Sequence, residues 1–256
     1  MVLSMDRWVG KVAVVTGTSA GIGSAIAELL VKRGLVVAGL ARRKERTEKL
    51  AAELTGEKGK LHAVRCDVTK EEDVVEAFAW VRDNLGPIHV LVNNAGLEQA
   101  TDLIDGDTEK WKKVLDTNIL GLCIATREAV RDMTANGVDG HVININSIIG
   151  HKVFYFPKVN MYPATKFAVT ALAETLRHEI NRNNLKIKIT SLSPGFVTSE
   201  LMNASYGREV ALADLNMDFD PFLNPDDIAH AVEYALSTPP HVQVSEITVR
   251  PVGERF

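Results

Sequence analysis

Tyr162 and Lys166 are the side chains whose types and spacing most directly suggest acid–base chemistry. They stand four residues apart in the run Tyr-Pro-Ala-Thr-Lys, and residues four apart share one face of a helix. A free phenol ionises at about pH 10, which is too high for a base at neutral pH. A neighbouring ammonium group favours the phenolate and lowers that pKa. Such a pair could give a proton to a carbonyl oxygen or take one from an alcohol. The alternative is a tyrosine and a lysine on the solvent face of an amphipathic helix.

A glycine-rich turn near the N-terminus suggests where a nucleotide would bind. Residues 16–23 read Thr-Gly-Thr-Ser-Ala-Gly-Ile-Gly. The β-branched run before them is typical of a buried parallel strand, and the apolar spacing after them suits a helix. A strand, a glycine turn and a helix together form the context of a dinucleotide-binding fingerprint.

Each glycine of this turn has an expected task. Gly17 lets the chain turn sharply, Gly21 lets a pyrophosphate approach the backbone, and Gly23 lets helix and strand pack closely. The free N–H groups at the start of the helix would face the phosphates. The spacing Gly-x-x-x-Gly-x-Gly differs from the common Gly-x-Gly-x-x-Gly. An ordinary glycine-rich turn therefore remains the alternative.

The residues after the second expected strand indicate which dinucleotide would bind. An acidic residue roughly twenty positions after the glycines would bind the ribose 2′-hydroxyl of NAD. Arg42 and Arg43 stand there instead, and guanidinium groups suit a 2′-phosphate through charge-assisted hydrogen bonds. We therefore expect NADP(H). The alternative is two solvated arginines at a helix start, where the helix dipole slightly disfavours them.

Strand and helix signals alternate along the whole chain and would position these residues. Strands are expected at 11–15, 35–41, 61–66, 90–92, 141–146, 187–192 and 247–249, and helices at 25–32, 43–54, 71–84, 111–133, 161–181 and after Asn224-Pro225. This alternation predicts an α/β fold with a single Rossmann-type, doubly wound parallel sheet of about seven strands and helices on both faces. With no linker or second core in the pattern, we expect one domain over 1–256.

Pro163 limits where the helix that carries Tyr162 can begin. A proline in the middle of a helix removes a hydrogen bond and clashes with the preceding turn. With Asn160 as the N-cap, Pro163 would fall in the first turn, whose N–H groups lack helical partners. We therefore expect this helix to begin at Met161.

The composition argues against several classes of protein. The 256 residues, 46% of them apolar, suit one α/β domain with a large core. A net charge of −4 offers no basic excess for nucleic acid or an anionic membrane. Two distant cysteines and seven histidines without ligand spacing predict neither a disulfide framework nor a metal site. No apolar run reaches the roughly 18 residues of a membrane span and no signal peptide is evident, so we expect a cytoplasmic protein.

Taken together, the motifs resemble those of the short-chain dehydrogenases/reductases over nearly the whole chain. The glycine turn, Asn93-Asn94-Ala95-Gly96, Asn118, Ser147, Tyr162-x-x-x-Lys166 and Pro194-Gly195 occur in the order of that family. Within the family the sequence is similar to NADP-dependent carbonyl and steroid reductases and to insect farnesol dehydrogenases. The finer similarity lies in residues 6–8, 39–43, 144–147 and 236–239.

The resemblance implies a catalytic group of Asn118, Ser147, Tyr162 and Lys166. Ser147 and Tyr162 would contact the substrate, with Ser147 stabilising charge on its oxygen. Lys166 would also hydrogen-bond the nicotinamide ribose, and Asn118 would bind a water that links Lys166 to solvent. The positive ring of an oxidised cofactor would further lower the pKa of Tyr162.

The same resemblance implies a set of cofactor contacts. Asp67 and Val68 would contact the adenine. The nicotinamide carboxamide would be held by Pro194, Gly195, Val197 and Thr198. Asn93 would instead brace neighbouring strands. The expected cofactor-binding residues are Gly17, Ser19, Ala20, Gly21, Ile22, Gly23, Arg42, Arg43, Asp67, Val68, Asn94, Ala95, Gly96, Tyr162, Lys166, Pro194, Gly195, Val197 and Thr198.

The weakly patterned region 198–223 is too long for an ordinary connection, and such loops are usually functional or mobile. We expect it to form a substrate wall for a lipophilic alcohol or ketone, although its apolar residues could simply bury the loop. These are Leu201, Met202, Tyr206, Leu212, Leu215, Met217, Phe219 and Phe222. The aromatic segment 154–156 could equally pack a loop or enter the substrate pocket.

The sequence thus predicts an NADP-dependent oxidoreductase that interconverts alcohols with aldehydes or ketones, such as an isoprenoid alcohol, a steroid or a xenobiotic carbonyl. One alternative is a protein of the same fold that binds NADP as a regulator or scaffold without turnover. Another is an NAD-dependent alcohol dehydrogenase. The family resemblance also implies a homodimer or a homotetramer.

Overall fold

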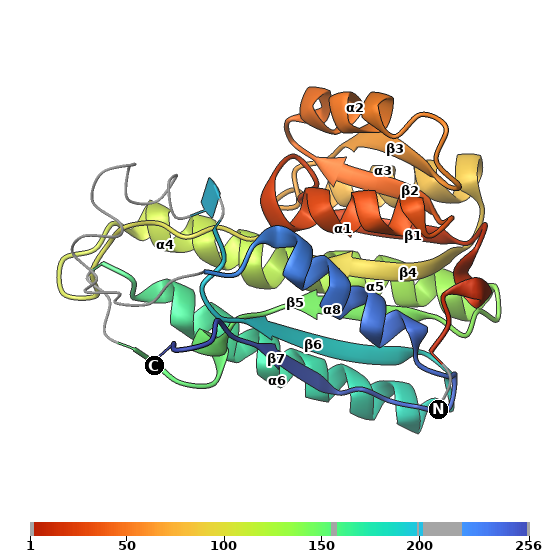
Figure 1. Cartoon of the computed structure of the whole chain (residues 1–256). Helices are drawn as coiled ribbons and strands as arrows, with labels where there is room; N and C mark the ends of the chain where they lie inside the picture. The colour runs from red at the N-terminus through yellow and green to blue at the C-terminus, as the bar shows by residue number, and fades with distance from the viewer. Residues whose placement is uncertain (1–2, 155–157, 199, 202–221, 255–256) are drawn as a thin grey trace.

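The structure is a computed structural model that describes residues 3–154, 158–198, 200–201 and 222–254. Seven parallel strands form one sheet in the order β3-β2-β1-β4-β5-β6-β7 (Figure 1). They are β1 (Val12–Thr16), β2 (Val36–Ala41), β3 (Lys60–Arg65), β4 (Ile88–Asn93), β5 (His141–Ile145), β6 (Lys188–Pro194) and β7 (Glu246–Val249). The predicted Rossmann-type sheet is confirmed, and each strand lies within two residues of its expected bounds at either end.

Helices cover both faces of this sheet. They are α1 (Gly21–Lys32), α2 (Lys44–Glu53), α3 (Glu71–Leu85), α4 (Thr108–Leu115), α5 (Leu122–Ala135), α6 (Met161–Arg182) and α8 (Pro225–Ser237). Helices α1 and α8 pack against each other on one face and enclose one apolar core (Figure 1). Helices α3, α5 and α6 enclose a second core on the opposite face.

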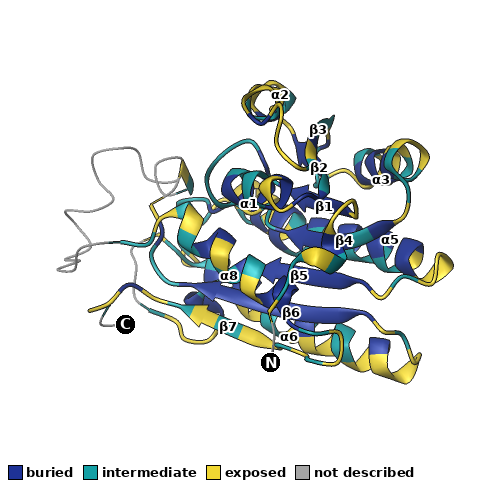
Figure 2. Ribbon diagram, turned by 45° about the vertical axis from the view of Figure 1, so that its right-hand side comes forward, coloured by how far each residue is buried: buried dark blue, intermediate teal, exposed yellow. Residues whose placement is uncertain are grey.

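The burial of the strands follows from this layered arrangement. All residues of β1, β5 and β6 are buried, because helices cover both sides of the central strands. Strand β1 accordingly consists mostly of β-branched residues, whereas β5 and β6 also bury polar residues such as Asn144 and Ser191. The edge strand β7 alternates between exposed and half-buried residues (Figure 2).

The long helix expected at 111–133 is present as α4 and α5, joined by a π-helical turn, η2 (Asp116–Gly121). Such π-turns are often found at functional sites, and this one contains Asn118. The Asn118 side chain hydrogen-bonds from this turn to Leu97, in the chain that follows β4.

Helix α6 begins at Met161 as predicted, so Pro163 lies in its first turn. Asn160 stands at the N-cap as predicted, but its side chain makes no capping hydrogen bond. Its amide group donates instead to the Thr101 carbonyl oxygen. Asn160 thus attaches the start of α6 to the chain that follows β4. By contrast, Asn224 caps α8 as expected, and its side chain accepts hydrogen bonds from the Asp226 and Asp227 amides at 3.0 and 3.2 Å.

The strand order reverses between β1 and β4, where the chain returns from β3 to the other side of β1. In doubly wound sheets, ligands bind in the crevice outside the carboxyl ends of the strands at this switch point. The glycine turn follows β1, and Asn94 follows β4 at the same edge. Within the described ranges, no helix is long and apolar enough to cross a membrane.

Candidate active site

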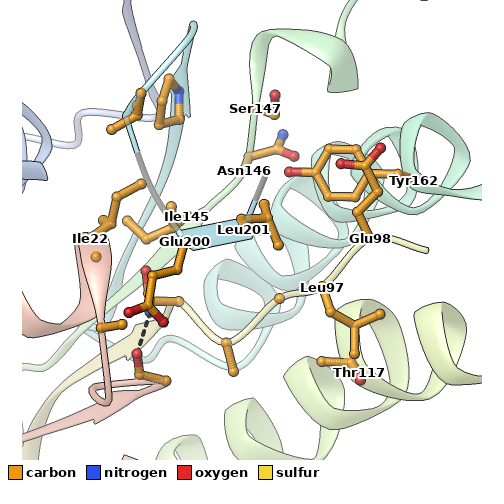
Figure 3. A pocket seen from close by; sticks show the side chains of 18 of the residues that line it. Ile22, Leu97, Glu98, Thr117, Ile145, Asn146, Ser147, Tyr162, Glu200 and Leu201 are labelled. Atoms are coloured by element: carbon orange, nitrogen blue, oxygen red, sulfur yellow. Dashed lines mark hydrogen bonds between the residues drawn. The ribbon is translucent and has the colours of Figure 1, made fainter. Parts of the chain in front are cut away.

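A pocket of about 830 Å³ lies over the carboxyl ends of the strands. It brings together segments that follow β1, β2, β4, β5 and β6, together with the first turns of α6 (Figure 3). Among its lining residues are Gly17, Ser19, Ala20, Gly21, Ile22, Arg42, Arg43, Asp67, Val68, Asn94, Ala95, Gly96, Ser147, Tyr162, Lys166, Pro194, Gly195 and Val197. Gly23, Asn118 and Thr198 lie outside this lining.

The backbone of the glycine turn requires its glycines. Gly17 and Gly21 have φ angles of +77° and +58°, in the left-handed region that side chains disfavour. A Cβ atom on Gly23 would overlap the Gly17 carbonyl oxygen and the Asn94 amide nitrogen. The N-cap of α1 is Ala20, which makes no side-chain capping hydrogen bond. The first N–H groups of α1 can therefore receive a phosphate, as the sequence predicts.

Thr16 and Asn94 hold the ends of β1 and β4 together below this turn. The Thr16 hydroxyl accepts hydrogen bonds from the Asn94 and Ala95 amides, both at 3.0 Å. The Asn94 side chain returns a hydrogen bond to the Thr16 carbonyl oxygen at 2.8 Å. Asn93 bonds to Asn144 of the neighbouring strand at 2.9 Å, which is the bracing contact that the sequence predicts.

The arginines after β2 are set beside the glycine turn by a buried contact. The hydroxyls of Thr18 and Thr47 lie 3.0 Å apart and join the turn to α2. Arg42 and Arg43 line the pocket from the start of this helix. Arg43 donates to the Ser19 hydroxyl at 3.2 Å. A positively charged end of the pocket therefore lies next to the glycine turn.

Tyr162 and Lys166 lie one turn apart on α6, and Ser147 follows β5 across from them. Figure 3 shows the phenol directed toward Asn146 and Ser147. The Lys166 ammonium donates to the Ile145 carbonyl oxygen at 2.9 Å and lies 5.5 Å from the centre of the Tyr162 ring. The three side chains predicted to do chemistry therefore meet in one pocket.

The pKa of Tyr162 differs from expectation. Burial raises it, the Glu98 carboxylate raises it further, and the hydrogen bond with Ser147 acts against both. The net shift of the phenol pKa is thus upward, and the expected lowering by Lys166 together with an oxidised cofactor stays a prediction. Burial also lowers the pKa of Lys166 to about 8, which leaves the side chain mostly protonated at neutral pH. Glu98 is buried beside the Tyr162 ring (Figure 3).

Asn118 lies outside the pocket lining and supports the pocket wall through hydrogen bonds. Its side-chain oxygen accepts from the Leu97 amide at 2.8 Å, and its amide donates to the Leu97 carbonyl and to the Thr165 hydroxyl at 2.9 and 3.1 Å. The Thr165 hydroxyl donates to the Tyr162 carbonyl oxygen at 2.7 Å. Asn118 thus joins the chain after β4 to the turn of α6 that carries Tyr162. Its expected link to Lys166 through water stays a prediction.

The turn after β6 closes the pocket at the Tyr162 side. The Glu254 carboxylate accepts a hydrogen bond from the Phe196 amide at 3.1 Å, and a Cβ atom on Gly195 would overlap that carboxylate. Thr198 donates its hydroxyl to the Leu223 carbonyl oxygen at 3.2 Å. This contact brings together the two ends of the region 198–223.

The expected substrate wall is described only in part. Leu201 lines the pocket, and Phe222 packs against Phe196 with ring centres 6.5 Å apart. Phe154 also lines the pocket. The remaining residues expected there, Tyr155, Phe156, Met202, Tyr206, Leu212, Leu215, Met217 and Phe219, lie outside the described residues.

Four charged residues at or near the site were not predicted. Glu98 stands two positions after Gly96, and Arg46 stands three after Arg43, so their spacing could have placed both near the pocket. Glu200 likewise follows Thr198 by two residues. Glu254 is distant from every motif, and no local pattern indicates that it would reach the turn after β6.

Comparison with known proteins connects this geometry to a family. Residues 11–209 match the family model described as short chain dehydrogenase. The chain is 50% identical over 254 residues to farnesol dehydrogenase of Aedes aegypti, which covers 98% of this chain and all of that protein. It is 43% identical over 253 residues to dehydrogenase/reductase SDR family member 11 of Bos taurus, covering 98% and 99% of the two chains.

Solved structures show the same relationship. An alcohol dehydrogenase from the archaeon Thermococcus sibiricus, complexed with 5-hydroxy-NADP, superposes with a TM-score of 0.82 at 30% identity, over 96% of this chain and 98% of that one. The closed form of serine dehydrogenase complexed with NADP⁺ gives a TM-score of 0.85 at 29% identity, over 96% of each chain. The matched segment includes the glycine turn, Ser147, Tyr162 and Lys166, and the chain belongs to the short-chain dehydrogenase/reductase family of oxidoreductases.

Proposed function

We propose that this oxidoreductase uses NADP(H) to interconvert a lipophilic alcohol with its aldehyde or ketone. The observation that carries the proposal is that Ser147, Tyr162 and Lys166 line the same pocket as the glycine turn and two arginines. One end of the pocket offers proton transfer, and the other offers positive charge.

The residues of the chain divide the chemistry between them. When bound, NADPH would supply the hydride for a carbonyl carbon. Ser147 would hold the carbonyl oxygen and stabilise the charge that develops on it. Tyr162 would give its proton to that oxygen, and in alcohol oxidation it would take a proton back. Since burial and Glu98 hold the phenol protonated, the resting side chain is suited to donate a proton.

The raised pKa of Tyr162 bears on the direction of the reaction. Alcohol oxidation needs the phenolate, which burial and Glu98 oppose. Burial lowers the pKa of Lys166 to about 8, so Lys166 still carries its proton at neutral pH. It would therefore favour the phenolate as well as bind the cofactor ribose.

The cofactor preference rests on the charge next to the glycine turn. Arg42 and Arg43 line the pocket, and within the described ranges Arg42 makes no ion pair. A 2′-phosphate would gain charge-assisted hydrogen bonds there, whereas the 2′-hydroxyl of NAD would find no acidic partner at the end of β2. Relatives solved with NADP or 5-hydroxy-NADP support this choice.

The substrate class rests on a relative and on the pocket wall. The farnesol dehydrogenase of Aedes aegypti shares half of its residues with this chain over nearly its full length. Leu97, Phe154 and Leu201 supply apolar surface on the Tyr162 side of the pocket. These features support an isoprenoid alcohol, with steroids and xenobiotic carbonyls as further candidates.

A substrate screen tests this function directly. The purified chain would be assayed with NADPH and NADH against farnesal and aromatic diketones, and with NADP⁺ and NAD⁺ against farnesol. We expect turnover with the phosphorylated cofactors. Arg42→Asp should weaken NADPH binding by roughly tenfold or more while sparing NADH. If NADPH absorbance falls with none of the substrates, the result would favour a protein that binds NADP without turnover. Unchanged NADPH affinity in Arg42→Asp would refute the role of Arg42.

We also propose that the chain forms a homodimer or a homotetramer. Strand β7 is an exposed edge of the sheet, and the side chain of Phe167 on α6 is 41% exposed. An exposed edge strand and an exposed aromatic side chain are each features through which copies of a chain can associate. Sedimentation of the purified chain would show whether it remains a monomer.

A further inference from the structure

Glu200 lies at the positively charged end of the pocket, far from the Tyr162 side (Figure 3). Its carboxylate oxygens each lie 3.0 Å from the same Arg46 nitrogen. One of them also lies 3.3 Å from Arg43. The chain after β6 is thus connected to α2 through an anion held between two guanidinium groups.

This arrangement is the one that a phosphate would need. Phosphate oxygens accept hydrogen bonds from the guanidinium fork in the same way as a carboxylate. The Arg43 nitrogen that contacts Glu200 also donates to the Ser19 hydroxyl of the glycine turn at 3.2 Å. The anion therefore sits beside both segments that would surround the ribose of the cofactor.

The contacts of Glu200 are weak enough to be exchanged. The side chains of Glu200, Arg43 and Arg46 are 56%, 48% and 44% exposed, and exposed ion pairs contribute little to stability. The described residues also leave a surplus of positive charge, because Arg42 adds a third guanidinium while Glu200 offers one carboxylate. That surplus suits a dianion better than it suits Glu200.

We propose that Glu200 is an internal anion that takes the place of the 2′-phosphate between Arg43 and Arg46, and that the bound phosphate displaces it. This inference rests on the proposed use of NADP(H) and deepens it. Arg46 becomes a third cation for the phosphate. Glu200 lowers the affinity for phosphorylated ligands, because its contacts with both arginines must break first.

The test measures binding without turnover. Adenosine 2′,5′-bisphosphate carries the 2′-phosphate, and 5′-AMP lacks it, so the two ligands isolate this contact. Isothermal titration of the full chain should show that Glu200→Gln binds the bisphosphate roughly three- to tenfold more tightly. Its affinity for 5′-AMP should not change. Arg46→Gln should weaken bisphosphate binding severalfold, and adding Glu200→Gln to it should yield a smaller gain than in the wild type.

Glu48→Gln is the matched control. Glu48 also lies on α2 and pairs with an exposed cation, Lys44, at 3.1 Å, but it does not line the pocket. It removes the same charge and should leave both affinities unchanged. Unchanged or weaker binding of the bisphosphate by Glu200→Gln would overturn the inference while the NADP(H) proposal stands. A wild-type chain that binds the bisphosphate no more tightly than 5′-AMP would overturn both.

Discussion

The two ends of the pocket are built in different ways. At the glycine turn, positive φ angles, the close packing of Gly23 and the hydrogen bonds between Thr16 and Asn94 fix the backbone. At the Tyr162 side, contacts between distant segments hold the wall: Asn118 with Leu97, and Glu254 with Phe196. The first end combines local backbone geometry with contacts between β1 and β4, and the second depends on side-chain contacts between segments.

This difference indicates which part of the pocket tolerates substitution. A backbone cradle tolerates few substitutions, because a single Cβ atom closes it. Side-chain contacts between distant segments can be replaced one at a time, so the substrate side can be altered without loss of the cofactor cradle. Substitutions at the two ends should therefore differ in both kind and size of effect.

Tyr162→Phe should give the largest effect and should separate chemistry from binding. It removes the proton that the phenol would donate, and general acid catalysis typically contributes about 10²- to 10⁴-fold to the rate. Turnover should fall by that factor, while NADPH affinity, measured by fluorescence titration, should change little. Tyr234→Phe on α8 is the control, since Tyr234 is 43% exposed and lies outside the pocket lining. Equal activity of the Tyr162 and Tyr234 variants would remove the proposed acid.

Gly23→Ala should break the cofactor end itself. The added Cβ atom would overlap the Gly17 carbonyl oxygen and the Asn94 amide, and neither group can move without opening the turn. Overpacking of this kind costs about 3 kcal/mol of unfolding free energy. Urea denaturation would measure the loss, and NADPH affinity should fall with it.

Gly96→Ala provides the contrast on the same pocket. Its added Cβ atom would lie 3.6 Å from the Asn118 side-chain oxygen, an ordinary contact. The free energy of unfolding should stay within about 0.5 kcal/mol of the wild type. A similar loss for both alanine variants would mean that the glycine turn has no special requirement for space.

The same contrast explains which parts of the structure the sequence predicts. Strand bounds, the turn at Gly17 and the start of α6 follow from local patterns, since burial, glycine and proline act over a few residues. Arg46 and Glu98 were within reach of such patterns. Both lie a few residues beyond a recognised motif, in the same helix or turn, so the position of the motif indicates where their side chains lie.

Other features depend on pairs of residues far apart in the chain. Asn160 stands at the N-cap of α6, but its side-chain oxygen makes no capping hydrogen bond, and its amide group donates to the Thr101 carbonyl oxygen instead. The pKa of Tyr162 rises because the fold buries the phenol and places Glu98 beside it, although Lys166 is its neighbour on the helix. Neither the hydrogen bond of Asn160 nor the raised pKa of Tyr162 can be predicted from residue spacing within one segment.

Glu254→Gln tests whether a distant side chain holds the turn after β6. The Glu254 side chain is fully buried, accepts from the Phe196 amide and pairs with Arg250. The amide group of glutamine would place a donor where one of these donors now binds, at a cost of about 2 kcal/mol in unfolding free energy. Glu233→Gln removes the carboxylate of another Arg–Glu pair, with Arg33, whose side chains are 43% and 21% exposed. It should cost less than about 1 kcal/mol, and equal losses in thermal or urea unfolding would contradict the proposed tie.

Glu98→Gln should give the smallest effect and the sharpest view of the Tyr162 side. The ionised Glu98 carboxylate raises the pKa of the phenol, because a negative charge nearby disfavours the phenolate. Without that charge the phenol should ionise at lower pH, so the rising limb of kcat/KM for alcohol oxidation should move down by roughly half a pH unit or more. Glu76→Gln, an exposed change on α3, should leave the limb in place. A limb that moves to higher pH in Glu98→Gln would mean that Glu98 favours the phenolate, which would contradict the proposed effect of its negative charge on the Tyr162 side of the pocket.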